Sequence, residues 1–174
     1  MKQPTLYIFS GLPASGKTTL AQRLAQYLSV TYIRIDTVEQ GLRDLCSVNV
    51  EGEGYRLSYR IAHDNLALRQ SVIADSCNPI VLTRKEWQQV AIDAGAEYVD
   101  IEISCSDVVE HQYRVEHRVC SINNLELPTW QQVKFREYHP WSSNVVRLDT
   151  SGKSIEDTFD ELLVKLAFIP SRPQ

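Results

Sequence analysis

Residues Gly11-Leu12-Pro13-Ala14-Ser15-Gly16-Lys17-Thr18 decide the fold, because they match the phosphate-binding P-loop pattern G-x-x-x-x-G-K-[ST] at every fixed position. An apolar run at residues 6–9 comes directly before the pattern. After it, Leu20, Leu24, Tyr27 and Leu28 recur at helical spacing, which indicates a helix over 17–28. A strand, a turn of small residues and a helix in this order predict a site for a nucleoside triphosphate.

Each fixed residue of the pattern has its own task. Backbone N–H groups of residues 12–18 are expected to surround the β-phosphate, and the positive helix end adds to their field. Lys17 reaches the β and γ oxygens, while the hydroxyl of Thr18 is placed to ligate Mg²⁺. A chance glycine turn at a core helix would not need Lys17 and Thr18 in register. The predicted cofactor-binding residues are Gly11, Leu12, Pro13, Ala14, Ser15, Gly16, Lys17, Thr18 and Thr19.

Length and composition limit the remaining possibilities. With 174 residues the chain fits a single domain over 1–174. Lys and Arg total 18 against 22 Asp and Glu, a formal charge of −4, so no global basic field attracts nucleic acid or an anionic membrane. The four cysteines are scattered without C-x-x-C spacing, as is typical of reduced thiols. Without a membrane-spanning apolar run or a leader, we expect a cytoplasmic protein.

The order of apolar runs and helical patterns predicts an α/β fold. Five short apolar runs, at residues 6–9, 32–35, 72–74, 98–103 and 145–148, predict strands. Helical patterns lie between them, at 17–28, 37–45, 56–69, 84–94, 106–119, 128–138 and 154–167. Strands that alternate with helices predict a five-stranded parallel sheet flanked by helices.

Ligands in such a sheet bind beyond the carboxyl ends of the strands. Polar residues stand at four of these ends, in the P-loop, at Asp36, at 75–78 and at 104–107, so we expect four loops to meet at one crevice. Two further polar stretches, 47–54 and 121–126, are candidate mobile loops near that crevice.

Asp36 follows the second predicted strand and is the candidate general base. There a carboxylate can face the γ-phosphate from the acceptor side and take a proton from a substrate hydroxyl. A second interpretation makes Asp36 the N-cap of the helix that starts at Thr37, with Glu39 completing a capping box. The two roles can coexist.

Asp75 follows the third predicted strand, where P-loop proteins carry the acidic residue that holds the hydration shell of Mg²⁺. We therefore expect Thr18 and Asp75 to serve the metal. Asn78 offers a donor and an acceptor to a substrate, although a plain turn explains it equally well.

Arg114 and Arg118 lie four residues apart on the predicted helix 106–119 and so share one face. Such a pair can hold a transferring phosphoryl group, and the other interpretation is solvated pairing with Glu110 or Glu116. The catalytic prediction therefore consists of Lys17, Asp36, Arg114 and Arg118.

The chain resembles the small P-loop kinases of the zeta-toxin, chloramphenicol phosphotransferase and polynucleotide kinase type, the AAA-like predicted kinases. The resemblance rests on residues 11–19, on Ile35-Asp36, on 72–79 with Arg84 and Trp87, and on Arg114 and Arg118. It implies a nucleoside-kinase-like P-loop NTPase fold with a small lid at about 114–128. It also implies transfer of the γ-phosphate of ATP, with Mg²⁺, to a hydroxyl that Asp36 activates, while the lid arginines hold the phosphates.

The acceptor stays open at this stage. Polynucleotide kinases carry an arginine three residues after the aspartate, where this chain has Glu39, so a small or uncharged hydroxyl compound fits better than nucleic acid. Adenylylsulfate kinases carry D-G-D-x-[VI]-R where residues 35–40 read I-D-T-V-E-Q. Nucleotide kinases need further cations, which Arg43, Arg56, Arg60 and Arg84 could supply.

The predicted substrate-binding residues are Glu39, Arg43, Asp75, Asn78 and Arg84. A nucleotide-dependent switch without phosphoryl transfer is the competing function, although the chain lacks the N-K-x-D motif of ordinary GTPases. A toxin or resistance role is a further possibility. No heptad pattern indicates an oligomeric state.

Overall fold

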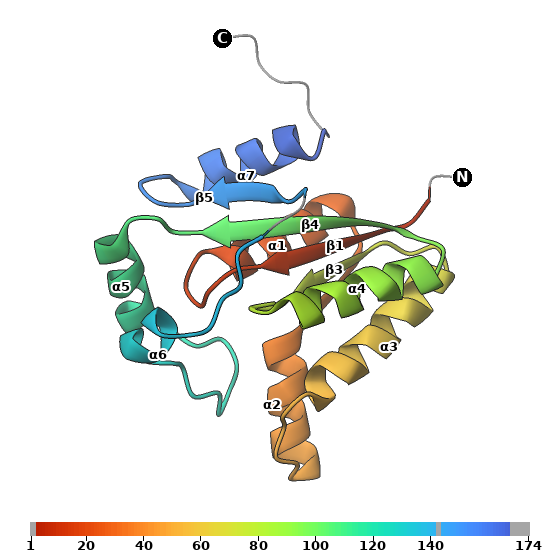
Figure 1. Cartoon of the computed structure of the whole chain (residues 1–174), viewed down its shortest axis with the longest axis horizontal. Helices are drawn as coiled ribbons and strands as arrows, with labels where there is room; N and C mark the ends of the chain where they lie inside the picture. The colour runs from red at the N-terminus through yellow and green to blue at the C-terminus, as the bar shows by residue number, and fades with distance from the viewer. Residues whose placement is uncertain (1–2, 142–143, 168–174) are drawn as a thin grey trace.

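The computed structural model describes residues 3–141 and 144–167 of the chain, so the two ends of the predicted domain 1–174 lie outside the described residues. Its centre is a five-stranded sheet in which every neighbouring pair of strands is parallel (Figure 1). The strands are β1 (Thr5–Ser10), β2 (Thr31–Arg34), β3 (Val72–Asp75), β4 (Glu97–Ser104) and β5 (Val146–Asp149), in the order β2-β3-β1-β4-β5. The predicted α/β fold with a parallel sheet is confirmed.

Helices connect the strands and cover the sheet. They are α1 (Lys17–Leu28), α2 (Ile35–Cys46), α3 (Glu53–Ala67), α4 (Val81–Asp93), α5 (Val108–His117), α6 (Trp130–Lys134) and α7 (Ile155–Lys165). The predicted helix 17–28 agrees with α1 at both ends. The predicted helices 106–119 and 128–138 are too long, because α5 has ended before Arg118 and α6 spans only 5 residues.

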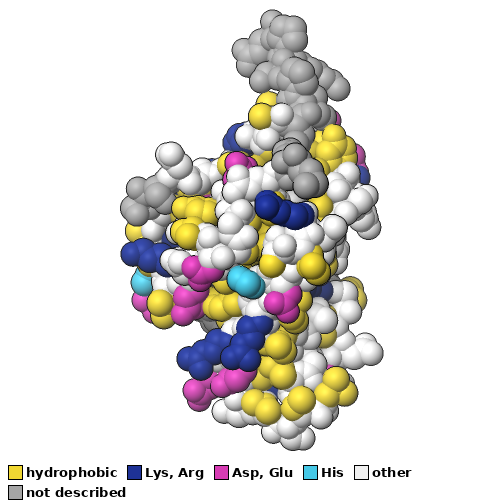
Figure 2. Space-filling model, turned by 90° about the vertical axis from the view of Figure 1, so that its right-hand side faces the viewer, with side chains coloured by type: hydrophobic (Ala, Val, Ile, Leu, Met, Phe, Trp, Pro, Cys, Tyr) yellow, Lys and Arg dark blue, Asp and Glu magenta, His cyan; other side chains and the backbone are white. Residues whose placement is uncertain are grey.

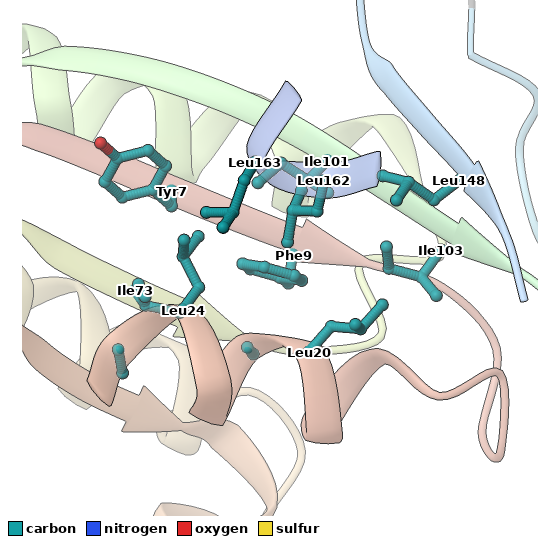
Figure 3. Packing of buried hydrophobic residues seen from close by; sticks show 12 residues of the cluster. Tyr7, Phe9, Leu20, Leu24, Ile73, Ile101, Ile103, Leu148, Leu162 and Leu163 are labelled. Atoms are coloured by element: carbon teal, nitrogen blue, oxygen red, sulfur yellow. The ribbon is translucent and has the colours of Figure 1, made fainter. Parts of the chain in front are cut away.

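Side chains along β1 alternate between the two faces of the sheet, and helices cover both faces. Tyr7 and Phe9 pack on one face with α1 and α7, as Figure 3 shows for the buried cluster around Leu24 and Leu162. Leu6 and Ile8 lie on the other face, in a cluster with residues of α3 and α4. Because both faces are covered, all six residues of β1 are buried.

The strand order places the P-loop in the middle of the molecule. β1 lies between β3 and β4, so the loop that leaves β1 has β2 and β3 on one side and β4 and β5 on the other. Figure 1 shows α5, α6 and the loop between them beyond the end towards which the strands point. A ligand at this end would meet residues of several elements.

The side of the molecule from which the strands start carries side chains of mixed type. Figure 2 shows acidic and basic side chains interspersed there among hydrophobic ones, so this side carries no field of one sign. Among residues 3–141 and 144–167, no helix has both the length and the apolar character needed to cross a membrane.

Candidate functional site

A pocket of about 770 Å³ lies at the carboxyl ends of the strands. Within its lining we distinguish two groups of residues, which we name by position. The P-loop side comprises residues 11–14 and 16–19 with Arg114, Thr150 and Lys153. The β2 side comprises Arg34, Asp36, Glu39, Arg43, Cys77, Arg118 and Arg136. Residues from β1 to α7 thus meet at one concavity of a size typical for small ligands.

The backbone of the P-loop is held in a conformation that depends on glycine. Gly11 has φ +147° and Gly16 has φ +92°, and a Cβ atom built on Gly11 would lie 2.2 Å from the carbonyl oxygen of Ile103. The Gly11 N–H donates to the Cys77 carbonyl at 3.1 Å, which anchors the loop to the end of β3. The first N–H groups of α1 lack partners within the helix and lie at the pocket, as an anion site requires.

Of the nine predicted cofactor-binding residues, all but Ser15 line the pocket. Ser15 is 1% exposed, and its hydroxyl finds no hydrogen-bond partner among the described residues. Its carbonyl accepts from the Thr150 hydroxyl at 2.9 Å, which joins the P-loop to the loop after β5. Ser15 therefore supports the conformation of the P-loop without lining the pocket.

Lys17 and Asp75 form a buried ion pair, with 2.7 Å between Lys17 Nζ and Asp75 Oδ1. The other carboxylate oxygen accepts from the Tyr32 hydroxyl at 2.7 Å. Burial alone would raise the pKa of Asp75, but the charge and hydrogen bond of Lys17, followed by hydrogen bonds from Tyr32 and Thr18, hold it below its usual value. Burial would lower the pKa of Lys17, yet Asp75 raises it. Both groups are thus charged around neutral pH.

The chemistry of this corner fits Mg²⁺. The hydroxyl of Thr18 lies against the carboxylate of Asp75, so two hard oxygen donors are side by side at the start of α1. Among the described residues, no group of three or more His, Cys, Asp or Glu side chains could enclose a metal ion.

Asp36 lies in the first turn of α2 and its side chain is 53% exposed at the pocket. The capping interpretation is wrong, because α2 begins at Ile35, two residues before the predicted start at Thr37, and Arg34 is the N-cap. No side-chain cap bond is present there. The carboxylate of Asp36 is 3.8 Å from Arg34 Nη2 and close enough to Lys17 for its charge to raise the Lys17 pKa.

Glu39 and Arg43 lie one turn apart on α2, and both line the β2 side. Arg43 Nη2 is 3.5 Å from Glu39 Oε2. Burial raises the pKa of Glu39, while Arg43 opposes this effect and the charge of Asp36 adds to it. Both predicted residues therefore line the pocket, where the charges of Arg43 and Asp36 act on the pKa of Glu39.

The two predicted lid arginines lie on different sides of the pocket. Arg114 donates to the Thr150 hydroxyl at 2.8 Å and carbonyl at 3.0 Å, and it pairs with Glu110 at 2.6 Å. His111 Nε2 lies 2.8 Å from the Pro13 carbonyl and so ties α5 to the P-loop. Arg118 is the C-cap of α5 with ψ 143°, so its backbone has left the helix. The Arg118 N–H still donates to the Arg114 carbonyl at 3.1 Å, so Arg118 lies one turn beyond Arg114, and both side chains reach the pocket.

The prediction that Asn78 and Arg84 bind substrate is corrected, because neither residue lines this pocket. Asn78 is 0% exposed, and its amide donates to the Phe9 carbonyl at 3.1 Å. Arg84 donates through Nε to the Asn78 carbonyl at 2.9 Å and through Nη2 to the His139 carbonyl at 2.8 Å. These bonds to buried backbone give both residues a structural role.

Several other expectations about loops are also corrected. Arg56 and Arg60 do not line the pocket, nor do the residues at 104–107 or 47–54. The loop after β5 takes the place expected for 104–107, with Thr150, Lys153 and Ser154 at the pocket. Of the stretch 121–126, Ser121, Leu125 and Glu126 reach it.

Sequence reasoning missed Arg34, Arg136, Thr150 and Lys153, all of which line the pocket. Arg34 stands beside Asp36 in the sequence and could have been found by reading one residue into the strand, since the carboxyl end of a strand faces the crevice. No local signal marks Arg136, which follows the short helix α6.

Comparisons with known proteins were made for the sequence and for the fold. The model of the AAA domain family matches residues 6–135 of this chain. Comparison with curated protein sequences finds no match. A solved structure described as that of a candidate kinase from Chloroflexus aurantiacus j-10-fl is 22% identical with a TM-score of 0.69, over 97% of this chain and 98% of that chain.

Two further similar structures come from proteins with stated activities. A gluconokinase from Sinorhizobium meliloti 1021 is 15% identical with a TM-score of 0.68, over 97% of this chain and 94% of that chain. The APS kinase of Mycobacterium tuberculosis, solved with AMPPNP and APS, is 16% identical with a TM-score of 0.59, over 96% and 99%. At these identities the structures establish the fold, and the family model covers most of the chain. The chain therefore belongs to the AAA domain family and has the fold of the small P-loop kinases.

Proposed function

We propose that the protein is a kinase that transfers the γ-phosphate of ATP to a hydroxyl group of a small-molecule acceptor. One observation carries this proposal, namely that Asp36 and the P-loop face the same pocket from two sides. A nucleotide switch needs the P-loop but has no use for an exposed carboxylate across the pocket from it. The β2 side therefore favours transfer to an acceptor over nucleotide binding alone.

The residues of the P-loop side would hold the donor. The N–H groups at the start of α1 and the ammonium of Lys17 contact the phosphates, and Arg114 approaches from α5. Thr18 and Asp75 would hold Mg²⁺, which neutralises charge on the phosphate oxygens when bound. Lys17 can keep its hydrogen bond to Asp75 while it contacts the phosphates, because one ammonium group can donate three hydrogen bonds.

Asp36 would act on the acceptor. Its carboxylate accepts the hydroxyl proton as the acceptor oxygen forms a bond to the γ-phosphorus, and the bond from that phosphorus to the bridging oxygen breaks to leave ADP. The Arg34 guanidinium, 3.8 Å from the Asp36 carboxylate, would help to fix where that carboxylate points. Arg114, on the P-loop side, stabilises charge on the transferring group.

The setting is proposed to be the cytoplasm, since all four cysteines are free. The experiment that tests the function is incubation of the purified protein with Mg²⁺, ATP and a metabolite extract, followed by mass identification of any compound that has gained one phosphoryl group. Formation of one such product, abolished by EDTA, supports the proposal. Hydrolysis of ATP without any phosphorylated product, in extracts of several sources, would contradict it.

A further inference from the structure

The β2 side contains a group of guanidiniums that the transfer chemistry does not explain. Arg34 ends β2, Arg118 follows α5 and Arg136 follows α6, yet all three line the same pocket. We call these three residues the arginine cluster. They come from segments far apart in the chain, so the fold brings them together.

The arginine cluster is short of negative charge. The only ion pair of the cluster among the described residues is that of Arg34 with Asp36, at 3.8 Å. Burial lowers the pKa of Arg118, Asp36 acts against this effect, and the charges of Arg34 and Arg136 lower the pKa further. The three guanidiniums therefore repel each other across the pocket. Asp36 lies beside Arg34 and the charge of Glu39 acts on Arg136, but Glu39 is also paired with Arg43, so these carboxylates offset the cluster only in part.

The cluster also has hydrogen-bond donors to spare. The Nε atoms of Arg34 and Arg118 are buried and have no partner among the described residues. The side-chain contact found for Arg136 is with Cys77 Sγ at 3.7 Å, and sulfur is a weak acceptor. Arg136 is exposed to solvent, but the buried Nε–H donors of Arg34 and Arg118 are of a kind that nearly always finds an acceptor in native proteins, and we expect a ligand to supply one.

The cluster is separate from the groups that would hold ATP. Arg114 is bonded to Thr150, which in turn bonds the P-loop through Ser15, whereas Arg118 interacts with the charge of Asp36. β2 is moreover an edge strand, with β3 between it and the strand that carries the P-loop. The cluster thus lies where an acceptor would sit.

We propose that Arg34, Arg118 and Arg136 bind a phosphate group of the acceptor, so that the substrate carries a dianionic phosphate in addition to its reacting hydroxyl. Guanidinium groups match phosphate oxygens with paired hydrogen bonds, and the excess positive charge of the cluster suits an anionic phosphate monoester. This assignment rests on the proposed kinase function, and it revises the expectation of an uncharged acceptor.

The test uses inorganic phosphate as the probe. Phosphate is titrated by calorimetry into protein saturated with Mg²⁺ and AMPPNP, so that the P-loop side is occupied. We expect saturable binding that Arg118→Ala and Arg136→Ala each weaken by about tenfold or more. Arg60→Ala, which removes an exposed arginine away from the pocket, serves as the matched control and leaves binding unchanged.

Two outcomes would overturn the proposal. One is the absence of phosphate binding to the loaded protein, and the other is binding that Arg118→Ala and Arg136→Ala leave intact. The thermal unfolding of every variant, together with the conservative variant Arg118→Lys, distinguishes loss of the phosphate site from loss of the fold. Because no turnover is measured, failure of this test leaves the kinase proposal standing, and loss of kinase activity would not remove a phosphate site that is seen by calorimetry.

Discussion

The P-loop side and the β2 side of the pocket are built in opposite ways. The P-loop side comes mainly from one continuous stretch, residues 11–19, in which Asp75 holds the side chain of Lys17 and the Thr150 hydroxyl donates to the Ser15 carbonyl. The β2 side is assembled from side chains of β2, α2, β3 and the segments after α5 and α6. A fixed backbone suits a donor that never changes, whereas separate side chains suit an acceptor that can differ between relatives.

The largest effect is expected from Lys17→Met. This variant leaves Asp75 buried without its partner, so we expect the free energy of unfolding to fall by about 3–5 kcal/mol and turnover to fall by about 10³-fold. Chemical unfolding and steady-state assays measure the two losses. Adding Asp75→Asn should restore most of the stability but none of the turnover. If the double variant regained activity, Lys17 would act only through the ion pair.

A pair of glycine variants tests whether the two sides differ in backbone tolerance. Gly11→Ala places a Cβ against the Ile103 carbonyl at a positive φ, so we expect a loss of about 2–3 kcal/mol in the free energy of unfolding. Gly41 lies within α2 with nothing within 4 Å of its would-be Cβ, and Gly41→Ala should stabilise by about 0.5–1 kcal/mol. Equal effects of the two variants in urea unfolding would refute the contrast.

A smaller and pH-dependent effect is expected from Tyr32→Phe. The Tyr32 hydroxyl helps to hold the pKa of Asp75 low, and its loss should cost about 1.5–3 kcal/mol at pH 7. A lowered carboxyl pKa stabilises above the unfolded value of about 4, and this contribution is lost as the pH falls through the folded value. The difference between wild type and Tyr32→Phe in urea unfolding should therefore stay constant from pH 7 to about pH 4 and shrink as the pH falls further, through the folded value.

A Tyr32→Phe difference that is the same at pH 3 and pH 7 would contradict this account. It would mean that the hydroxyl stabilises by packing or by another contact and that the Asp75 charge is set by Lys17 alone. The matched control is Tyr59→Phe, whose hydroxyl bonds the exposed Glu86 at 3.0 Å and should show no comparable effect.

The same contrast explains what could be predicted from the sequence. The P-loop residues and α1 were predictable because adjacent residues make both the turn and the helix that follows it. The parallel sheet followed from alternating patterns along the chain. These features depend on short-range order.

The β2 side was less predictable because its members meet only in the folded chain. Arg84 looked like a free cation, yet the carbonyl of His139 and the ring of Trp141, 4.1 Å from its guanidinium, hold it inside the protein. Arg136 carries no local signal and reaches the pocket through the path of the chain after α6. A shift of two residues at the start of α2 likewise moved Asp36 from a cap into the helix.

The most direct test of the account is the comparison of Asp36→Asn with wild type, once an acceptor is known. The two quantities are the ATP dissociation constant and the rate of phosphoryl transfer at saturating ATP and acceptor. We expect an unchanged ATP affinity, because Asp36 lies on the β2 side, and a transfer rate lower by about 10²–10⁴-fold, because the hydroxyl loses its base. Undiminished transfer by Asp36→Asn would contradict the division of the pocket into a donor side and an acceptor side.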